Sequence, residues 1–215
     1  MMTRFWAHTV GAIVAIVALG ASANQAQAAF TLNFDDINVG GQNSIPNGYG
    51  GFDWNNFFTI DKTILPDSGY NRGTVSDNNT AFNGFANPAA LSSASLFTFN
   101  SAYLTAAWNT GLSIQVEGIV GGVTIYTQTV IVDNLAPTLF TFNYANIDTL
   151  RFTSFGGTDA SAADGGSGEH FALDNATFGG DVNPTPAPAG IVLFGLGFAG
   201  MGMLRSLRKG KTAVA

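Results

Sequence analysis

Two alternating segments joined by a pair of glycines limit the fold of this 215-residue chain more than any other feature. Leu112–Gly118 reads LSIQVEG and Val123–Thr129 reads VTIYTQT, so that apolar and polar side chains largely alternate in both. A period of two is typical of a strand with one buried face. Gly121-Gly122 lies between the segments, and glycine readily adopts the positive φ angles of a tight hairpin turn. The sequence therefore predicts an antiparallel β-hairpin here.

The segment between residues 30 and 178 shows further short runs and no helical periodicity of useful length. Glycine, asparagine, aspartate and proline separate these runs, as they commonly separate strands. Besides the hairpin, the predicted strands are Phe30–Phe34, Phe52–Phe57, Leu96–Asn100, Tyr103–Trp108, Leu139–Asn143, Thr149–Ser154 and Phe171–Phe178. About nine strands at this spacing are typical of a sandwich. We therefore expect an all-β domain, an antiparallel β-sandwich, over residues 29–180.

The pentapeptide LFTFN occurs twice, at Leu96–Asn100 and at Leu139–Asn143. One interpretation is a duplicated half of the sandwich. The other is two strands that share a requirement for inward-facing Leu/Thr or Phe/Phe side chains. No longer repeat accompanies the pentapeptide, and both interpretations stay open at this point.

The composition is aromatic and poor in charge. Aromatic residues make up 12% of the chain and charged residues 10%, against roughly 25% charged in an average soluble protein. The absence of cysteine excludes disulfides and thiolate metal sites. All fourteen acidic residues lie between Phe30 and Asp181, together with only Lys62, Arg72 and Arg151 as basic residues. Nucleic-acid binding requires a basic surface, so we expect no nucleic-acid partner.

The first 28 residues have the pattern of a secretory signal peptide. Arg4 supplies a positive start, Val10–Ala21 is a short apolar region, and Ala26-Gln27-Ala28 is a small-x-small cleavage site. The alternative is an uncleaved anchor helix. The pattern predicts a signal helix over residues 1–28, removal by signal peptidase, and a mature chain that starts near Ala29.

The C-terminal end combines a proline-rich linker, an apolar stretch and a basic tail. Residues 181–188 form the linker, and prolines of this kind keep a chain extended. Ala187–Leu204 is uncharged, and eighteen helical residues span about 27 Å, at the lower limit for crossing a bilayer. Basic residues follow at once, which predicts a cytoplasmic end by the positive-inside rule. We therefore expect a membrane helix here.

These features together resemble the PEP-CTERM sorting signal of exported bacterial proteins, over residues 187–211 and the prolines before them. The residues that carry the resemblance are Pro184, Pro186, Pro188, Arg205, Arg208 and Lys209. The resemblance implies recognition and cleavage by an exosortase-like enzyme, a transient membrane anchor, and release at the cell surface or into the extracellular matrix. The chain departs from the family in having Pro-Thr-Pro and Pro-Ala-Pro where the family has Pro-Glu-Pro, which puts the processing enzyme in question.

The order of motifs in the middle segment also resembles the β-sandwich of other PEP-CTERM proteins, which is similar to jelly-roll carbohydrate-binding modules. The motifs are FDD, IPNGYGGFDW, SAYLTAAWNTGLSIQVEG, VGGVTIYTQT and FALDNATF. In such modules the first and last strands are often neighbours, and the resemblance implies a structural calcium site at Asp35, Asp36 and Asp174. Calcium prefers hard oxygen ligands. The alternative is that these carboxylates cap strand ends and bond loop amides.

Aromatic and amide side chains gather at two places that suit a sugar ring. Tyr49 and Trp54 lie in Ile45–Phe57, and Trp108-Asn109 and Tyr126 could extend the same platform. Aromatic faces contact the apolar faces of sugars while amides bond their hydroxyl groups. The alternative is core packing around a glycine turn.

The sequence gives little support to catalysis. His170 is the one histidine outside the predicted signal peptide, and no GxSxG nucleophile motif is present. We therefore expect no enzyme, but an exported, non-catalytic protein of the cell surface or extracellular matrix that associates with exopolysaccharide. The alternatives are a structural surface or biofilm protein without a sugar site, and a glycan hydrolase with two carboxylates.

Overall fold

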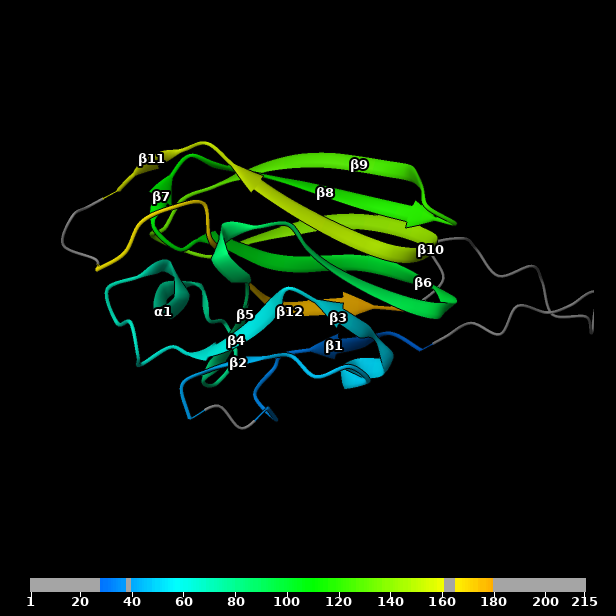
Figure 1. The fold of residues 1–215 in the computed structure, drawn as a ribbon, viewed down its shortest axis with the longest axis horizontal. Coiled ribbons are helices and arrows are strands. Elements are labelled where there is room, and N and C mark those ends of the chain that lie inside the picture. Colours follow the sequence, from blue (N-terminus) through cyan, green and yellow to red (C-terminus); the bar gives the residue numbers. More distant parts are fainter. Residues whose placement is uncertain (1–27, 38–39, 161–164, 180–215) are drawn as a thin grey trace, which may run out of the picture.

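The computed structural model of the protein describes residues 28–37, 40–160 and 165–179 (Figure 1). Apart from Ala28, the predicted signal peptide lies outside these residues. The linker and the sorting signal, with Pro184, Pro186, Pro188, Arg205, Arg208 and Lys209, lie outside them as well. These assignments stay predictions. Among the described residues, no helix is long and apolar enough to cross a membrane.

The described residues form an antiparallel, jelly-roll-like β-sandwich, in agreement with the predicted fold class. The strands are β1 (Phe30–Leu32), β2 (Gln42–Ser44), β3 (Asp53–Asn55), β4 (Phe57–Asp61), β5 (Asn79–Asn83), β6 (Ala89–Ala106), β7 (Asn109–Thr110), β8 (Leu112–Val120), β9 (Val123–Val132), β10 (Thr138–Phe155), β11 (Thr158–Asp159) and β12 (Phe171–Phe178). The helical turns are η1 (Tyr49–Gly51), α1 (Gly69–Gly73) and η2 (Gly84–Ala86). Within the described residues, helical structure is thus confined to short connections between strands.

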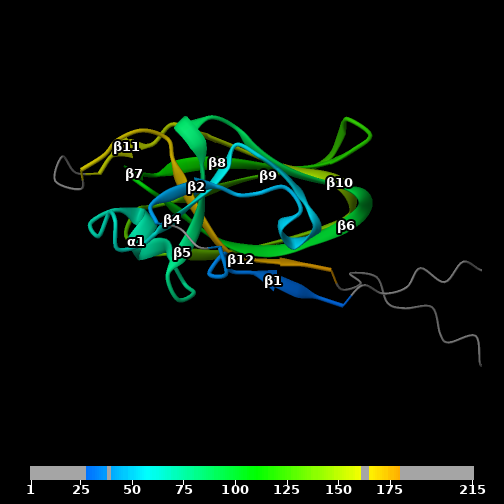
Figure 2. The same cartoon turned by 60° about the horizontal axis from the view of Figure 1, so that its bottom comes forward.

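Two long strands, β6 and β10, belong to both layers of the sandwich (Figure 2). Residues 89–92 of β6 and 149–155 of β10 lie in one layer with β3, β8 and β9. We call this layer A. Residues 99–106 of β6 and 138–141 of β10 lie in the other layer with β12, β1, β5, β4 and β2. We call this layer B. The register shifts between Thr141 and Thr149 allow β10 to bend from one layer to the other.

The main core lies between the two layers and is rich in phenylalanine. On β8, Leu112, Ile114 and Val116 are fully buried, as the alternation in this strand predicts. Phe99 and Phe142 stack with ring centroids 5.0 Å apart, so the two long strands contact each other through aromatic rings. Large buried aromatic side chains of this kind supply most of the apolar area that stabilises a sandwich.

A second, smaller apolar cluster covers the outer face of layer B. Side chains of β4, β5 and β12 alternate between the main core and this cluster, which takes Phe58, Ile60, Phe82 and Ala172. Tyr70 of α1 closes the cluster from outside. The backbone approach is close, because a Cβ built on Gly69 would lie 1.8 Å from the carbonyl oxygen of Ala106. Glycine at this position therefore allows α1 to sit directly on the end of β6.

The predicted hairpin is confirmed. β8 and β9 pair antiparallel, and Gly121 and Gly122 have φ angles of 56° and 83°. The predicted adjacency of first and last strands is also confirmed, since β1 pairs with β12. The two copies of LFTFN both direct phenylalanines inward, Phe97 and Phe99 in one, Phe140 and Phe142 in the other.

The strand boundaries differ from the prediction in two ways: Phe52–Phe57 is divided between β3 and β4, and neighbouring predicted strands are joined. The segments predicted as separate strands at Leu96–Asn100 and Tyr103–Trp108 belong largely to β6, and those at Leu139–Asn143 and Thr149–Ser154 belong to β10. In β10, Asn143 and Asn146 adopt positive φ angles of 54° and 57°. Asparagine tolerates this conformation, so the two residues form irregularities within the strand rather than ending it.

Candidate functional site

A pocket of about 320 Å³ lies on the second apolar cluster, at the outer face of layer B. Strands β4 and β5, helix α1, turn η2 and the segment before β12 contribute its walls. Its aromatic lining consists of Phe58, Tyr70, Phe82, Phe85, Trp108 and His170. The volume is at the lower end of the range for small-molecule sites.

Trp108 lies between the end of β6 and the start of β7, and its position is fixed on two sides. The Tyr70 ring meets the indole edge to face, with centroids 5.5 Å apart and planes at 87°. A Cβ built on Gly166 would lie 2.4 to 2.6 Å from three indole carbons, so the segment before β12 crosses directly over the indole. The amide of Ala107 also donates to the carbonyl of His170 at 2.9 Å. Trp108 thus ties two walls of the pocket together.

Phe85 is the exposed aromatic side chain of the pocket, with 80% of its surface accessible. Its φ is 55° and that of Ala86 is 54°, a left-handed conformation that is unusual for residues other than glycine. The side-chain amide of Asn56 holds the turn, donating to the carbonyls of Gly84, Asn87 and Pro88 at 3.0 to 3.3 Å. Strain that the surrounding structure maintains is often found at binding sites.

Polar groups at the pocket come from Gln42, Ser167 and His170. The Nδ1 atom of His170 is buried and has no hydrogen-bond partner among the described residues. Burial lowers the pKa of His170, and a hydrogen bond with the Ser167 backbone opposes part of that effect. The imidazole is therefore neutral at physiological pH. One of its nitrogens can donate a hydrogen bond and the other can accept one.

The five residues predicted to bind sugar do not form one platform. Trp54 is 8% exposed and belongs to the main core, whereas Trp108 is 5% exposed and belongs to the second cluster. The Trp54 indole nitrogen donates to the Tyr49 carbonyl at 2.9 Å. On β3, which pairs with β6, the alternation directs Trp54 inward while Asp53 and Asn55 face outward.

The remaining two predicted sugar contacts lie elsewhere. Asn109 is buried and donates from its side-chain amide to the carbonyl of Gly156 at 2.9 Å. Tyr126 on β9 stacks on Tyr144, with centroids 4.8 Å apart and planes at 8°. Of the five, Trp108 alone lines the pocket among the described residues. Sequence reasoning missed Phe85 because nothing in the residues Gly84-Phe85-Ala86 indicates the left-handed turn.

The acidic residues predicted for calcium bond loop amides instead. Asp174 is fully buried on β12, and its Oδ2 atom accepts from the amides of Val75 and Ser76 at 2.7 and 2.9 Å. Its Oδ1 atom accepts from the amide of Asn175 at 2.7 Å. Burial raises the pKa of Asp174, and these hydrogen bonds oppose part of the rise.

Asp35 binds the same connection between α1 and β5 as Asp174 does, a few residues further along the chain. Its carboxylate accepts from the amides of Asp77, Asn78 and Asn79 at 2.8 to 3.1 Å. Burial on its own raises the pKa of Asp35, but the amide donors and Ser76 outweigh it and the pKa is below its ordinary value. The two carboxylates therefore fasten the connection between α1 and β5 to layer B and to the segment after β1.

Asp36 accepts from the Tyr49 hydroxyl at 2.7 Å. Within the part of the chain that the structure describes, no three His, Cys, Asp or Glu side chains converge as a metal site would require. The alternative interpretation of the acids, that they bond loop amides, is confirmed for Asp35 and Asp174. Calcium binding stays a prediction.

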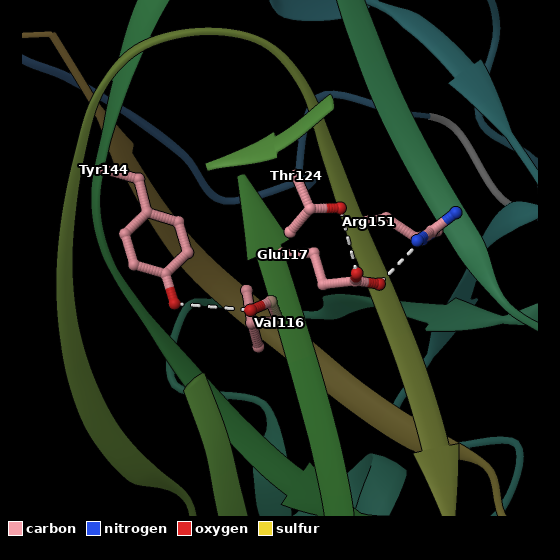
Figure 3. A network of polar contacts seen from close by, with 5 residues as sticks. All are labelled: Val116, Glu117, Thr124, Tyr144 and Arg151. Carbon is pink, nitrogen blue, oxygen red and sulfur yellow. Dashed lines mark hydrogen bonds and ion pairs between the residues drawn. The ribbon is translucent and has the colours of Figure 1, made fainter. Parts of the chain in front are cut away.

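A polar network lies on the outer face of layer A (Figure 3). Glu117 of β8 accepts from Arg151 of β10 at 2.8 Å and from the Thr124 hydroxyl at 3.2 Å. The Arg151 hydrogen bond lowers the pKa of Glu117, although burial opposes it. Both carboxylate oxygens are thus engaged and the group is ionised at neutral pH. A glycosidase acid instead needs a raised pKa and a second carboxylate nearby.

No family model matches the sequence, and no curated protein matches it. Several solved structures have a similar arrangement of strands. The N-terminal CBM22-1–CBM22-2 tandem domain of Paenibacillus barcinonensis Xyn10C is 15% identical with a TM-score of 0.41, covering 79% of this chain and 49% of that one.

A DUF4465 family protein from Bacteroides ovatus is 12% identical with a TM-score of 0.43, covering 73% of this chain and 90% of that one. The family 29 carbohydrate-binding module CBM29_1 from Piromyces equi is 10% identical with a TM-score of 0.36, covering 72% of this chain and 91% of that one. This chain therefore spans about half the length of the first of these proteins and most of the other two. Similarities at this level do not indicate a ligand for this chain.

Proposed function

We propose that the sandwich binds carbohydrate, without catalysing a reaction on it, in the pocket between Phe85 and Trp108. The observation that carries the proposal is the exposed Phe85 ring beside a pocket whose other aromatic side chains are buried or half-buried. Strained turns that the surrounding structure maintains cluster at ligand-binding sites, and the turn at Phe85 is of this kind. Its face suits the apolar side of a sugar ring, and the pocket polar groups suit the hydroxyl edge.

The polar groups favour a sugar over a purely apolar ligand. Gln42, Ser167 and His170 all line the pocket and carry groups that can hydrogen-bond a hydroxyl. A hydrocarbon chain would leave these groups unpaired.

Non-catalytic binding fits the chemistry of the pocket better than hydrolysis does. Within the described residues no carboxylate lines the pocket, whereas glycoside hydrolysis commonly uses two. The neutral His170 lacks an acidic partner there. The pocket therefore supplies contact surface and hydrogen bonds, but no acid and base pair.

The sequence supports an exported setting for this binding. The proposed itinerary comprises removal of the signal peptide by signal peptidase, a transient membrane anchor, and processing by an exosortase-like enzyme at the PEP-CTERM-like tail. The sandwich would then act at the cell surface or in the extracellular matrix, with exopolysaccharide as its partner. Mass spectrometry of the native protein tests this itinerary: a start near Ala29 and loss of the basic tail support it, and retention of residues 189–215 replaces it with a permanent anchor.

The binding proposal is tested with the full chain and a panel of insoluble and soluble polysaccharides. We expect at least one polymer to retain the protein, and Phe85→Ala to weaken that binding about tenfold, which corresponds to about 1.4 kcal/mol. Leu135→Ala is the matched control, because Leu135 is also a large exposed apolar side chain, 72% accessible, and lies outside the pocket. Retention on no polymer, or equal binding by both variants, would overturn the proposal.

A further inference from the structure

Strand β9 forms a long sheet edge that no other described strand pairs with. The strand order of the larger sheet ends in β9, which pairs with β8 alone among the described residues. Figure 1 shows β9 at the upper rim of the molecule. The opposite end of the sheet is β2, which has three residues, whereas β9 has ten. Short edge strands limit pairing between molecules, and β9 lacks this protection.

The sequence of β9 also lacks the usual protective residues. VTIYTQTVIV contains no charge, no proline and no glycine, and such residues are the common means by which native edges avoid association. Its outward apolar side chains are exposed: Val123 by 64%, Ile125 by 48% and Ile131 by 68%. The one register shift with β8 makes Ile125 an extra residue of β9 near the hairpin, and residues 126–132 pair regularly. Most of the strand is therefore regular and open.

Charge indicates which partner suits this edge. The sandwich is acidic, so a basic partner would bind where its carboxylates lie. Strand β9 carries no carboxylate and therefore does not suit a basic partner. The neighbouring charges, Glu117 and Arg151, neutralise each other in an ion pair. A second copy of the chain is acidic too, and two such copies repel each other least where both surfaces are uncharged. The neutral strand thus favours its own counterpart.

The alternation of β9 is also self-complementary. In an antiparallel pair of two β9 strands with a two-fold axis at Thr127, the exposed Ile131 lies toward the exposed Val123 and Ile125 of the second copy. Thr127 then lies opposite its own counterpart, and Thr–Thr pairs are favourable across strands. A two-fold arrangement repeats each contact, as is usual in homodimers.

We propose that β9 pairs edge to edge with β9 of a second copy, so that layer A continues through two molecules. This pairing is independent of the sugar site, because no residue of β9 lines the pocket. A dimer would carry two pockets, and two linked sites hold a repetitive polymer more tightly than one does. Edge-to-edge pairing buries a small area, so we expect a reversible dimer.

A single cysteine tests the geometry, since the chain contains none. In Thr127→Cys the two thiols would face each other at a strand-pair distance of about 4.5–5.5 Å between Cβ atoms, close enough for a disulfide after small adjustments. The full chain is purified in mild detergent, which prevents association through its apolar ends, and then oxidised. We expect a disulfide-linked dimer for Thr127→Cys and little for the control Ser44→Cys, an exposed residue of the opposite edge strand.

Sedimentation of the cysteine-free chain gives a second measurement. We expect a concentration-dependent dimer in the unaltered chain, and a dissociation constant at least tenfold higher in Thr127→Lys, because two lysines would face each other. Thr127 is exposed, so the melting temperature should not change. A monomer at all concentrations, equal cross-linking of both cysteine variants, or a dimer that persists in Thr127→Lys would overturn the proposal. Polysaccharide retention by monomeric Thr127→Lys reports on the sugar site separately.

Discussion

Replacement of Asp174 tests whether its carboxylate fastens the α1–β5 connection to the sheet. In Asp174→Ala the amides of Val75 and Ser76 lose their acceptor, and so does the amide of Asn175. The side chain is fully buried, so water has no direct route to replace it without a local opening. The connection and α1 should therefore loosen before the rest of the sandwich does.

The size of the effect follows from the number of donors and from the cost of burying the charge. Three amide donors at about 1 kcal/mol or more each give a loss of roughly 3–5 kcal/mol. Removal of a buried carboxylate returns part of this, because burial raises its pKa and so disfavours its ionised form. We expect a net loss of about 2–3 kcal/mol, which lowers the melting temperature of a chain of this size by roughly 4–12 °C.

The assay is thermal unfolding of the full chain at pH 7, followed by circular dichroism. Asp67→Ala is the matched control, since it removes the same charge from an exposed position. A fall in melting temperature of less than about 2 °C, or equal falls in both variants, would refute the fastening role. Hydrogen exchange at residues 75 and 76 should rise in Asp174→Ala and not in Asp67→Ala.

The same melts with calcium and with a chelator test the calcium prediction. The oxygens of Asp174 and Asp35 already accept from amides, and a cation there would face the positive ends of those N–H groups. If the amide contacts are the whole role of these carboxylates, the melting temperature should not depend on calcium, whereas calcium binding as predicted from the sequence should raise it. A rise with calcium that disappears in Asp174→Ala would refute the reasoning from amide contacts and establish the carboxylate as a ligand.

Two further predictions concern backbone contact and pH. Gly69→Ala should lower the melting temperature strongly, because the added Cβ would lie 1.8 Å from the Ala106 carbonyl oxygen. Gly40→Ala should have little effect, since a Cβ there meets no described atom within 4 Å beyond its chain neighbours. Calorimetry of both variants tests this. The folded-state pKa of Asp35 is lowered, so its contribution to stability is present above the ordinary aspartate pKa and is lost as the pH falls through the lowered value. Urea unfolding between pH 7 and pH 3 should show this loss in the unaltered chain and a smaller one in Asp35→Asn; equal pH dependence would contradict it.

The hairpin was predictable because its determinants are local. Alternation in β8 and β9 and the two glycines between them are read directly from adjacent residues. Strand β5 was not predicted, since its sequence NTAFN begins and ends with asparagine. Both Asn79 and Asn83 are buried, and hydrogen bonds to distant groups make this tolerable: Asn83 bonds Ser154 and the amide of Phe171. The pattern of neighbouring residues does not indicate such distant hydrogen-bond partners.

The residues predicted to contact sugar do not lie on one surface, and the reason is again a pairing between distant parts of the chain. Local sequence places aromatic residues on strands, but which face of the sandwich each strand presents depends on pairing far along the chain. Trp54 and Trp108 enter different clusters because β3 pairs with β6 in layer A while the end of β6 lies in layer B. The bend of β6 separates them, and no feature of either tryptophan's neighbours encodes that bend.

The acidic residues show how a correct position can carry a different role. Asp35 and Asp174 both accept hydrogen bonds from the connection that follows α1. Helix α1 in turn places Tyr70 against Trp108 at the pocket. The carboxylates therefore support one wall of the proposed sugar site from outside. Loosening that connection should disturb the Tyr70–Trp108 contact, whereas the turn that presents Phe85 is held independently by Asn56. If the pocket binds sugar, Asp174→Ala should weaken binding through the Trp108 wall while leaving the Phe85 contribution in place.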